Sequence, residues 1–350
     1  MRLLLADKID IQALEELRVL GIEIVSRPEL TKDTLPDALE GVGILVVRST
    51  EVTAKAIDAG KQLNLIVRAG AGVNTIDVVA ASSHGVYVAN CPGKNGAAVA
   101  ELTFGLILAL DRRLVDATVE LRAGRWEKSR YSAARGLLGQ RIGIAGLGAI
   151  GQEVLARSRA FGLEAWAWSR SLSAKSAAKM GVAHARSLEE LASKSDIFTV
   201  HLALKPQTRG IINRQVLEAL PDGAIVINAS RSEVLDYAAL EELIPKKNLR
   251  VGLDVFATEP DEGSAAFDAP ILKSGVVYGT PHIGASTEQA QRAIARETAR
   301  IIRCFLTEES IPNVVNVCAA SPARFVIVVR MLDKVGVLAN TLSVLKRHGI

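Results

Sequence analysis

Short apolar runs alternate with amphipathic stretches along most of the chain. Runs rich in Val, Ile and Leu are typical of strands buried on both faces of a parallel sheet. In the first part of the chain the pattern predicts strands over 2–6, 22–26, 43–47 and 63–67, and a helix over 9–20 with apolar positions at Ile11, Leu14, Leu17 and Leu20. Strands that alternate with helices in this way indicate an α/β domain.

The same alternation continues after an apolar helix predicted over 97–110, in which Glu101 is the only charge. Further strands are predicted at 142–145, 164–168, 197–200, 224–228, 251–253 and 276–278, with helices over 152–161 and 288–306. The last helix would return the chain to the first domain. We therefore expect two doubly wound parallel-sheet domains with a cleft between them, 1–97 with 286–318 and 98–285.

A glycine-rich turn between two of these strands carries the clearest chemical signal. Gly146, Gly148 and Gly151 follow strand 142–145 at G-x-G-x-x-G spacing. In this context the first glycine permits the tight turn, the second lets the backbone approach a pyrophosphate, and the third lets the helix pack closely. The N–H groups at the start of that helix, including those of Ala149 and Ile150, would bind the phosphates.

The end of the next strand departs from the usual dinucleotide-binding pattern. An acidic residue about 20 positions beyond the fingerprint normally binds the adenine ribose hydroxyls and selects NAD. Here the chain reads Trp168-Ser169-Arg170-Ser171, without a carboxylate. Ser169 and Arg170 are the expected contacts at this point, and Arg170 could accept a 2′-phosphate, so both NAD and NADP stay open as the cofactor.

Polar residues follow several predicted strands, where open α/β sheets bind their ligands. Arg231 could hold a carboxylate bidentately and polarise a neighbouring carbonyl. Glu259 would fix the ring of His282, and His282 would move a proton while a hydride passes to or from the nicotinamide. In the first domain, the loops of Arg48-Ser49-Thr50 and of 68–73 are candidates to line the cleft.

Composition favours a small anionic substrate. The net charge is +4 and aromatic residues make up only 4%, without a long basic run, so nucleic acid is a poor partner. The apolar run at the start of the chain is too short for a signal peptide, and no stretch approaches the ~18 consecutive apolar residues that a membrane span needs. The sequence therefore predicts a cytoplasmic protein. The five histidines form no i, i+4 pair, so no metal site is expected.

Segments 228–236, 254–260 and 281–285 resemble the three signature segments of the D-isomer-specific 2-hydroxyacid dehydrogenases. The resemblance implies a flavodoxin-like substrate domain, a Rossmann NAD(P)-binding domain, and Arg231, Glu259 and His282 as the catalytic residues. It also implies that Asp254 holds the nicotinamide amide. The other cofactor contacts that it implies are Leu202, Ala229, Ser230, Gly284 and Ala285.

Members of this family that act on a phosphorylated substrate look most similar. Arg48 and Ser49 match their phosphate loop, while Ala71, Gly72 and Val73 would assist Arg231 at the substrate carboxylate. The implied reaction is NAD(P)-dependent oxidation of 3-phospho-D-glycerate to 3-phosphohydroxypyruvate, the first step of L-serine biosynthesis. The alternatives are an NADPH-dependent glyoxylate or hydroxypyruvate reductase and a dinucleotide-sensing protein that resembles a co-repressor.

Two further expectations come from the same resemblance. Helix 97–110 and the basic segment 124–130 are similar to the dimer-forming region of the family, which implies a homodimer or a higher homo-oligomer. Residues 323–350 resemble the beginning of an ACT domain, with a strand over 325–330 and a helix that runs to about residue 347.

Overall fold

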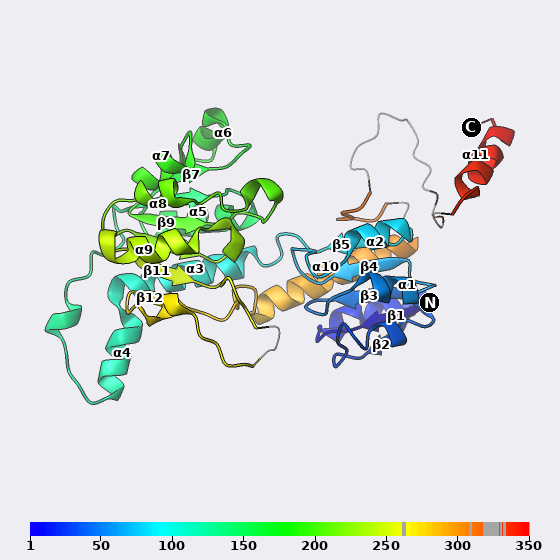
Figure 1. Ribbon diagram of the computed structural model, residues 1–350, viewed down its shortest axis with the longest axis horizontal. Helices are drawn as coiled ribbons and strands as arrows, with labels where there is room; N and C mark the ends of the chain where they lie inside the picture. Colours follow the sequence, from blue (N-terminus) through cyan, green and yellow to red (C-terminus); the bar gives the residue numbers. More distant parts are fainter. Residues whose placement is uncertain (261–263, 308–309, 318–328, 330, 332–333, 350) are drawn as a thin grey trace. The chain divides into compact units, whose positions relative to one another are not determined.

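The computed structural model describes residues 1–260, 264–307, 310–317, 329, 331 and 334–349 (Figure 1). The chain forms two compact units, Met1–Asn95 with Glu288–Ile350 and Gly96–Thr287. Each unit contains one parallel sheet, which confirms the predicted α/β class with two doubly wound domains.

The sheet of the first unit has the strand order β2-β1-β3-β4-β5, which is the flavodoxin-like order. Its strands are β1 (Arg2–Leu5), β2 (Glu23–Ser26), β3 (Val42–Val47), β4 (Leu65–Arg68) and β5 (Tyr87–Asn90). The hydrophobic pattern predicts the first four strands and misses β5. The helices are η1 (Ile11–Leu20), η2 (Pro36–Ala38), α1 (Ala54–Ala59), α2 (Val78–Ser83) and α10 (Glu288–Thr307).

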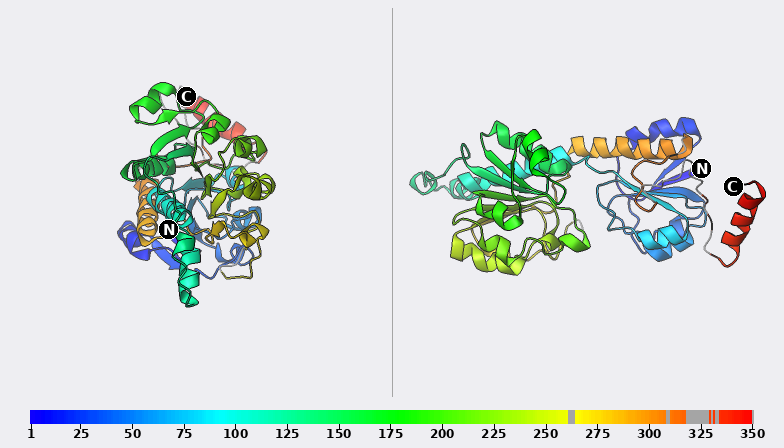
Figure 2. Two further views of the ribbon diagram at one scale, coloured as in Figure 1. Left: turned by 90° about the vertical axis from the view of Figure 1, so that its left-hand side faces the viewer. Right: turned by 90° about the horizontal axis from the view of Figure 1, so that it is seen from above.

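The first helix of this unit is a 3-10 helix rather than an α-helix. Its apolar residues recur at every third position, which matches the three residues per turn of a 3-10 helix. Asp10 caps the helix by accepting a hydrogen bond from the Gln12 N–H, and Gly21 ends it with φ of 77°. Leu14 and Leu17 are buried, and α10 lies beside this helix (Figure 2).

The sheet of the second unit has seven parallel strands in the order β12-β11-β10-β9-β6-β7-β8. They are β6 (Arg141–Ala145), β7 (Glu164–Trp168), β8 (Ala183–His184), β9 (Ile197–Val200), β10 (Ile225–Asn228), β11 (Arg250–Leu253) and β12 (Val277–Gly279). The prediction of six strands is therefore corrected to seven. The additional strand, β8, contains two residues, which is too short to produce a recognisable pattern.

Helices cover this second sheet and complete the unit. The α-helices are α3 (Gly96–Arg112), α4 (Leu114–Arg122), α5 (Ala149–Ala160), α6 (Ala174–Lys179), α7 (Leu188–Ser193), α8 (Arg214–Glu218) and α9 (Tyr237–Lys247). Short 3-10 helices are η3 (Ser129–Tyr131), η4 (Pro206–Thr208), η5 (Ser232–Val234) and η6 (Pro270–Lys273).

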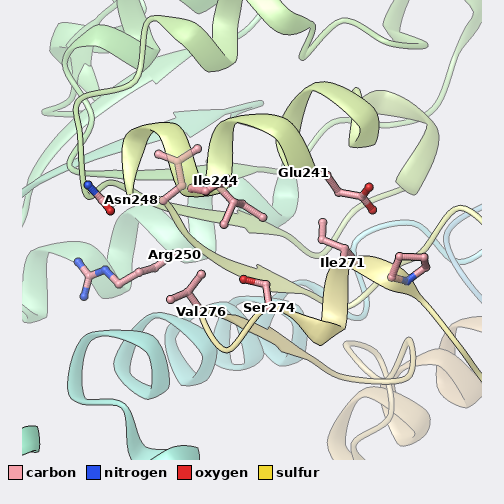
Figure 3. Close-up of a pocket in the computed structure, with 10 residues that line it drawn as sticks. Glu241, Ile244, Asn248, Arg250, Ile271, Ser274 and Val276 are labelled. Carbon is pink, nitrogen blue, oxygen red and sulfur yellow. The ribbon is translucent and has the colours of Figure 1, made fainter.

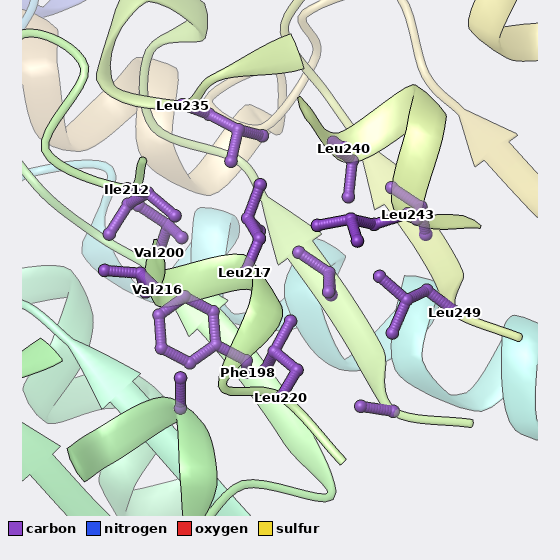
Figure 4. Close-up of a cluster of buried hydrophobic side chains, with 14 of the residues drawn as sticks. Phe198, Val200, Ile212, Val216, Leu217, Leu220, Leu235, Leu240, Leu243 and Leu249 are labelled. Atoms are coloured by element: carbon purple, nitrogen blue, oxygen red, sulfur yellow. The ribbon is translucent and has the colours of Figure 1, made fainter. Parts of the chain in front are cut away.

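The core of the second unit explains why its strands are predominantly apolar. Val226 of β10 belongs to a cluster around Phe198 and Leu217, whereas Ile225 and Ile227 of the same strand belong to another cluster (Figure 4). Alternate side chains point to opposite faces of a strand, so both faces of the sheet are buried. Because all seven strands are parallel, their carboxyl ends lie along one edge of the sheet.

The C-terminal part of the chain contains α11 (Val337–Arg347), where the sequence predicts a helix. Most of the strand predicted over 325–330 lies outside the described residues, so the resemblance to an ACT domain is not confirmed. Within the described part of the chain, no helix is long and apolar enough to cross a membrane.

Candidate active site

The glycine turn after β6 requires glycine at two of its three positions. Gly146 has φ of 102°, and a Cβ atom there would lie 2.5 Å from the carbonyl oxygen of His201. A Cβ atom on Gly151 would lie 2.1 Å from the carbonyl oxygen of Gly146. Around Gly148, in contrast, no atom lies within 4 Å of a built Cβ atom. The turn therefore leaves open space at the one glycine that is expected to face the pyrophosphate.

The start of α5 suits an anion. No side chain caps this helix at Gly148, so the N–H groups of Ala149 and Ile150 are available as donors. Leu202 borders the turn, because its Cδ2 atom would lie 3.0 Å from a Cβ atom placed on Gly146. The Gly146 N–H donates to the carbonyl of Trp168 at 2.8 Å, which ties the turn to the end of β7 and to Ser169 and Arg170 beyond it. These residues fit a bound dinucleotide.

The turn that carries Arg231 is fixed by Asn228, the last residue of β10. The Asn228 Oδ1 atom accepts hydrogen bonds from the N–H and the hydroxyl of Ser230, at 3.0 and 2.8 Å. The Asn228 side-chain amide donates to the Arg231 carbonyl at 3.0 Å, and Ala229 is buried within this turn. Arg231 Nη1 donates to the Ser230 carbonyl at 2.7 Å. Among the described residues, no acceptor contacts the other guanidinium nitrogens, which leaves them for a ligand.

His282 and Glu259 form a direct hydrogen bond. The distance between His282 Nδ1 and Glu259 Oε2 is 2.6 Å, and Glu259 Oε1 accepts from the Phe256 N–H at 2.9 Å. Burial alone would raise the pKa of Glu259, but hydrogen bonds from His282 and Phe256 and the nearby charge of Arg231 lower it. Glu259 is thus an acceptor at neutral pH. With Nδ1 engaged, the Nε2 atom of His282 can exchange a proton with a ligand.

The buried carboxylate of Asp254 holds the loop that presents His282. Asp254 is 1% exposed and follows β11. Its Oδ1 atom accepts from the Thr280 hydroxyl at 2.6 Å and the Ile283 N–H at 2.8 Å, and its Oδ2 atom accepts from the Gly284 N–H at 2.8 Å. These bonds bracket His282, whose φ of 51° is rare for a residue with a side chain.

Gly284 and Ala285 continue the same loop. A Cβ atom on Gly284 would lie 2.8 Å from Asp254 Oδ2, so the close approach of the loop to this carboxylate requires glycine. A hydrogen bond of 2.8 Å from the Ser286 N–H to the Ile283 carbonyl closes the loop around these two residues. The structure shows that Asp254 holds the loop of His282. The predicted contact between Asp254 and the nicotinamide amide stays a prediction.

Sequence reasoning missed several residues that support this site. Thr280 and Asn228 anchor the loops of His282 and Arg231, and the hydroxyl of partly buried Tyr237 donates to the Val255 carbonyl. His201 lies beneath the glycine turn, where burial lowers its pKa to about 3 and its Nε2 atom is 2.8 Å from Thr199 Oγ1. The only signal in the sequence is that Asn228 and Thr280 are polar residues at the ends of strands.

The predicted substrate residues Arg48 and Ser49 lie in the first unit, after β3. The N–H groups of Arg48, Ser49 and Thr50 all donate to Asp7 Oδ2, at 2.6, 3.2 and 3.1 Å. Arg48 Nη1 donates to Gln291 Oε1 of α10 at 2.8 Å. The backbone donors of this loop are therefore already occupied, which leaves the guanidinium of Arg48 and the Ser49 hydroxyl as the groups for an anion.

The loop of Ala71, Gly72 and Val73 follows β4 in the same unit. The Asn90 side-chain amide donates to the Ala71 carbonyl at 2.6 Å, and the Cys91 N–H donates to the Gly70 carbonyl at 2.9 Å. Asn90 and Cys91 lie at the end of the neighbouring strand β5. The loop that is expected to meet a substrate carboxylate is thus fixed by the next strand of the sheet.

One pocket of the second unit is separate from these residues. It has a volume of about 550 Å³ and is lined by residues of α9 and η6 together with Asn248, Arg250 and Val276 (Figure 3). Arg250 begins β11 and Val276 precedes β12, so this pocket lies at the amino ends of the strands, opposite to His282. In the described part of the chain, no three His, Cys, Asp or Glu side chains are grouped to hold a metal ion.

Comparison with known proteins agrees with this geometry. Residues 104–284 match the model of the D-isomer specific 2-hydroxyacid dehydrogenase NAD binding domain. The chain belongs to the D-isomer-specific 2-hydroxyacid dehydrogenase family. It is 38% identical to D-3-phosphoglycerate dehydrogenase of Methanocaldococcus jannaschii over 318 residues. This alignment covers 90% of this chain and 59% of that protein. The chain thus spans about six-tenths of the length of that relative.

Two other proteins are similar to this chain over different shares of its length. The chain is 42% identical over 275 residues to hydroxypyruvate reductase of Thermotoga maritima, over 78% of this chain and 88% of that protein. The crystal structure of the TT0316 protein of Thermus thermophilus superposes with a TM-score of 0.80 at 30% identity. That match covers 90% of this chain and all of the other.

The glycine turn offers a test that separates folding from cofactor binding. We expect Gly151→Ala to destabilise the second unit even without a dinucleotide, because its Cβ atom meets the Gly146 carbonyl. Gly148→Ala should change the free energy of unfolding by at most about 1 kcal/mol, the scale of a change at an N-cap, yet weaken dinucleotide binding. The three tryptophans all lie in the second unit, so their fluorescence during urea unfolding reports on it. Equal stability of the two variants would contradict this account.

Proposed function

We propose that this chain is an NAD(P)-dependent dehydrogenase that oxidises 3-phospho-D-glycerate to 3-phosphohydroxypyruvate, the first step of L-serine biosynthesis. The observation that carries the proposal is the hydrogen bond between His282 and Glu259 in the same unit as Arg231 and the glycine turn. A proton acceptor, a cation for a carboxylate and an anion-binding helix terminus are the groups that such an oxidation needs.

Each residue has a distinct task in the proposed reaction. Arg231 binds the substrate carboxylate through its free guanidinium N–H groups and polarises the oxygen on C2. The Nε2 atom of His282 takes the hydroxyl proton, and the carboxylate of Glu259 stabilises the imidazolium that forms. The bound nicotinamide supplies the acceptor for the hydride that leaves C2, so that the C2 hydroxyl becomes a carbonyl. In the reverse direction His282 returns the proton.

Replacement of the histidine tests this assignment. His282→Asn should lower kcat by roughly 100-fold or more, because proton transfer by a positioned side chain contributes at least that much. Dinucleotide affinity should change little, since the glycine turn is intact. The matched control is His84→Asn, which removes a histidine paired with Asp58 in the first unit. Steady-state rates within a few-fold of the parent for His282→Asn would refute the role of His282.

The lowered pKa of Glu259 also determines how the stability of the fold changes with pH. A carboxyl whose pKa is lower in the folded state stabilises the fold above its unfolded pKa, and this contribution is lost as the pH falls through the folded pKa. The hydrogen bond with His282 should therefore survive through neutral pH and fail only in acid, below the ordinary pKa of 4.5 for Glu.

The choice of a phosphorylated substrate depends on Arg48. Its guanidinium is oriented by Gln291, and its loop is held by Asp7, so the charge is fixed at the carboxyl end of β3. We expect Arg48→Ala to reduce kcat/KM for 3-phosphohydroxypyruvate about tenfold or more, as the loss of a charged hydrogen bond predicts, without an equal loss for glyoxylate. Arg27→Ala, which removes an exposed arginine paired with Glu29, is the matched control.

Reduction of glyoxylate or hydroxypyruvate is the second candidate function. It is favoured by the 42% identity to the Thermotoga maritima hydroxypyruvate reductase, of which this chain covers 88%. Initial rates with 3-phosphohydroxypyruvate, hydroxypyruvate and glyoxylate, each at saturating reduced dinucleotide, separate the two. A preference for an unphosphorylated substrate, with no effect of Arg48→Ala, would favour the reductase.

We also propose that the chain forms a homodimer through α4, which extends from the rest of its unit (Figure 1). None of its residues is buried, and Leu114, Val115, Val119 and Leu121 are each about half exposed. The segment that follows exposes Trp126 and is held by ion pairs of Glu120 with Arg125 and Arg130. Exposed apolar surface of this kind marks an interaction site.

A charge placed on α4 should separate the subunits. Val119→Asp puts a carboxylate in the proposed interface, so we expect sedimentation velocity to show a dimer for the parent and a monomer for this variant at micromolar concentration. The control is Val79→Asp, at a position that is 81% exposed in the first unit, which should remain a dimer. A monomeric parent would exclude the proposed dimer.

A further inference from the structure

Tyr237 joins the start of α9 to the loop that follows β11. It is the first residue of α9, directly after the capping residue Asp236, whose side chain accepts a hydrogen bond from the Ala239 N–H at 3.0 Å. The ring packs against the buried cluster that contains Phe198. The hydroxyl donates a hydrogen bond to the Val255 carbonyl. Because the helix start fixes the backbone and the cluster fixes the ring, the phenol oxygen has a defined position.

The carbonyl that accepts this hydrogen bond belongs to the peptide group that binds Glu259. The Val255 carbonyl and the Phe256 N–H are the two ends of one planar trans unit, and they point in opposite directions. The N–H donates to Glu259 Oε1 at 2.9 Å, while Glu259 Oε2 lies 2.6 Å from His282 Nδ1. A donor on the carbonyl therefore also fixes the direction of the N–H, and it polarises the amide so that this N–H donates more strongly.

The phenol oxygen also contacts the residue that fixes the turn of Arg231. Burial raises the pKa of Tyr237 above its ordinary value of 10.0, and a hydrogen bond with Asn228 offsets only part of this rise. The charges of Glu259 and Glu233 raise the same pKa further. The hydroxyl therefore keeps its proton at neutral pH and remains a donor. Since Asn228 holds the backbone of the Arg231 turn, one oxygen atom links this turn to the loop of Glu259.

The peptide between Val255 and Phe256 is shielded from water. Val255 is 1% exposed and Phe256 is 7% exposed. A buried carbonyl that loses its donor is costly, because water cannot replace the missing hydrogen bond. Without the phenol hydroxyl the peptide would turn toward another donor, and its N–H would move away from Glu259.

We propose that Tyr237 is a positioning residue of the acid–base pair, because its hydroxyl fixes the peptide group that holds Glu259 against His282. The inference rests on the dehydrogenase function proposed above. Burial raises the pKa of Glu259, and hydrogen bonds from His282 and from the Phe256 N–H lower it below its ordinary value. Loss of the Tyr237 hydroxyl weakens the bond from this N–H, so the pKa of Glu259 rises and the carboxylate holds the ring of His282 less firmly.

Four variants of the full chain test this link. Tyr237→Phe removes only the hydroxyl, Glu259→Ala removes the group through which the hydroxyl acts, and a third variant combines the two substitutions. The control is Tyr131→Phe in the same unit. The buried hydroxyl of Tyr131 has no hydrogen-bond partner among the described residues, so its removal breaks no such link.

The titration of Glu259 can be followed without substrate or turnover. Glutamate is labelled with ¹³C at the carboxyl carbon, and the NMR signal of Glu259 is identified by its absence from Glu259→Ala. We expect Tyr237→Phe to raise the pKa of Glu259 by about half a pH unit, the size of a weakened hydrogen bond, and Tyr131→Phe to leave it unchanged. Superimposable titration curves of Glu259 in the parent and in Tyr237→Phe would overturn the proposal.

The single-turnover rate of hydride transfer tests whether the link serves the reaction. We expect Tyr237→Phe to lower the rate of the parent roughly 3- to 10-fold, the worth of one neutral hydrogen bond, and to change the rate of Glu259→Ala less than about twofold. Equal losses in both backgrounds would also overturn the proposal, because Tyr237 would then not act through Glu259. A raised pKa of Glu259 in Tyr237→Phe, with a parent that turns over no hydroxy acid, would instead refute the proposed function alone.

Discussion

The carboxylate of Asp254 is the constraint on which the candidate active site depends. A charge that is almost completely buried costs several kcal/mol unless hydrogen bonds replace its water. Three donors do so here, and all three belong to the loop that contains His282. The left-handed backbone of His282 is a strained conformation that persists only when its surroundings enforce it. The ring is thereby held against Glu259, with its other nitrogen open to a ligand.

The strand order of the parallel sheet then determines which functional groups lie together along its carboxyl edge. Seven strands with one direction place seven loops along one edge, and the strand order separates them into two groups. Arg231, Glu259 and His282 follow β10, β11 and β12, which are adjacent strands. The glycine turn and Arg170 follow β6 and β7 on the other side of β9. One half of the edge therefore suits proton and hydride chemistry, and the other suits the phosphates of a dinucleotide.

Much of the fold could be predicted because its strands are buried on both faces. Continuous apolar runs such as Val42–Val47, which is buried throughout, stand out against the polar residues that flank them. The pattern fails where that signal is too short, as in β8, and the spacing of Ile11, Leu14 and Leu17 does not by itself state which type of helix forms. Arg231, Glu259 and His282 could be chosen from the sequence because each follows a predicted strand.

The supporting contacts could not be predicted, since they join residues far apart in the sequence. The donors to Asp254 come from positions 26 to 30 residues later, and Asp7 accepts from a loop more than 40 residues away.

The most direct test of the central claim is the single-turnover rate of hydride transfer in Asp254→Asn at saturating dinucleotide. An asparagine amide cannot accept from the three donors as the carboxylate does, so the loop loses its anchor and His282 its position. We expect a fall of roughly 100-fold or more, comparable to the loss of the general acid–base group itself. A rate within a few-fold of the parent would show that the Asp254 tether does not position His282.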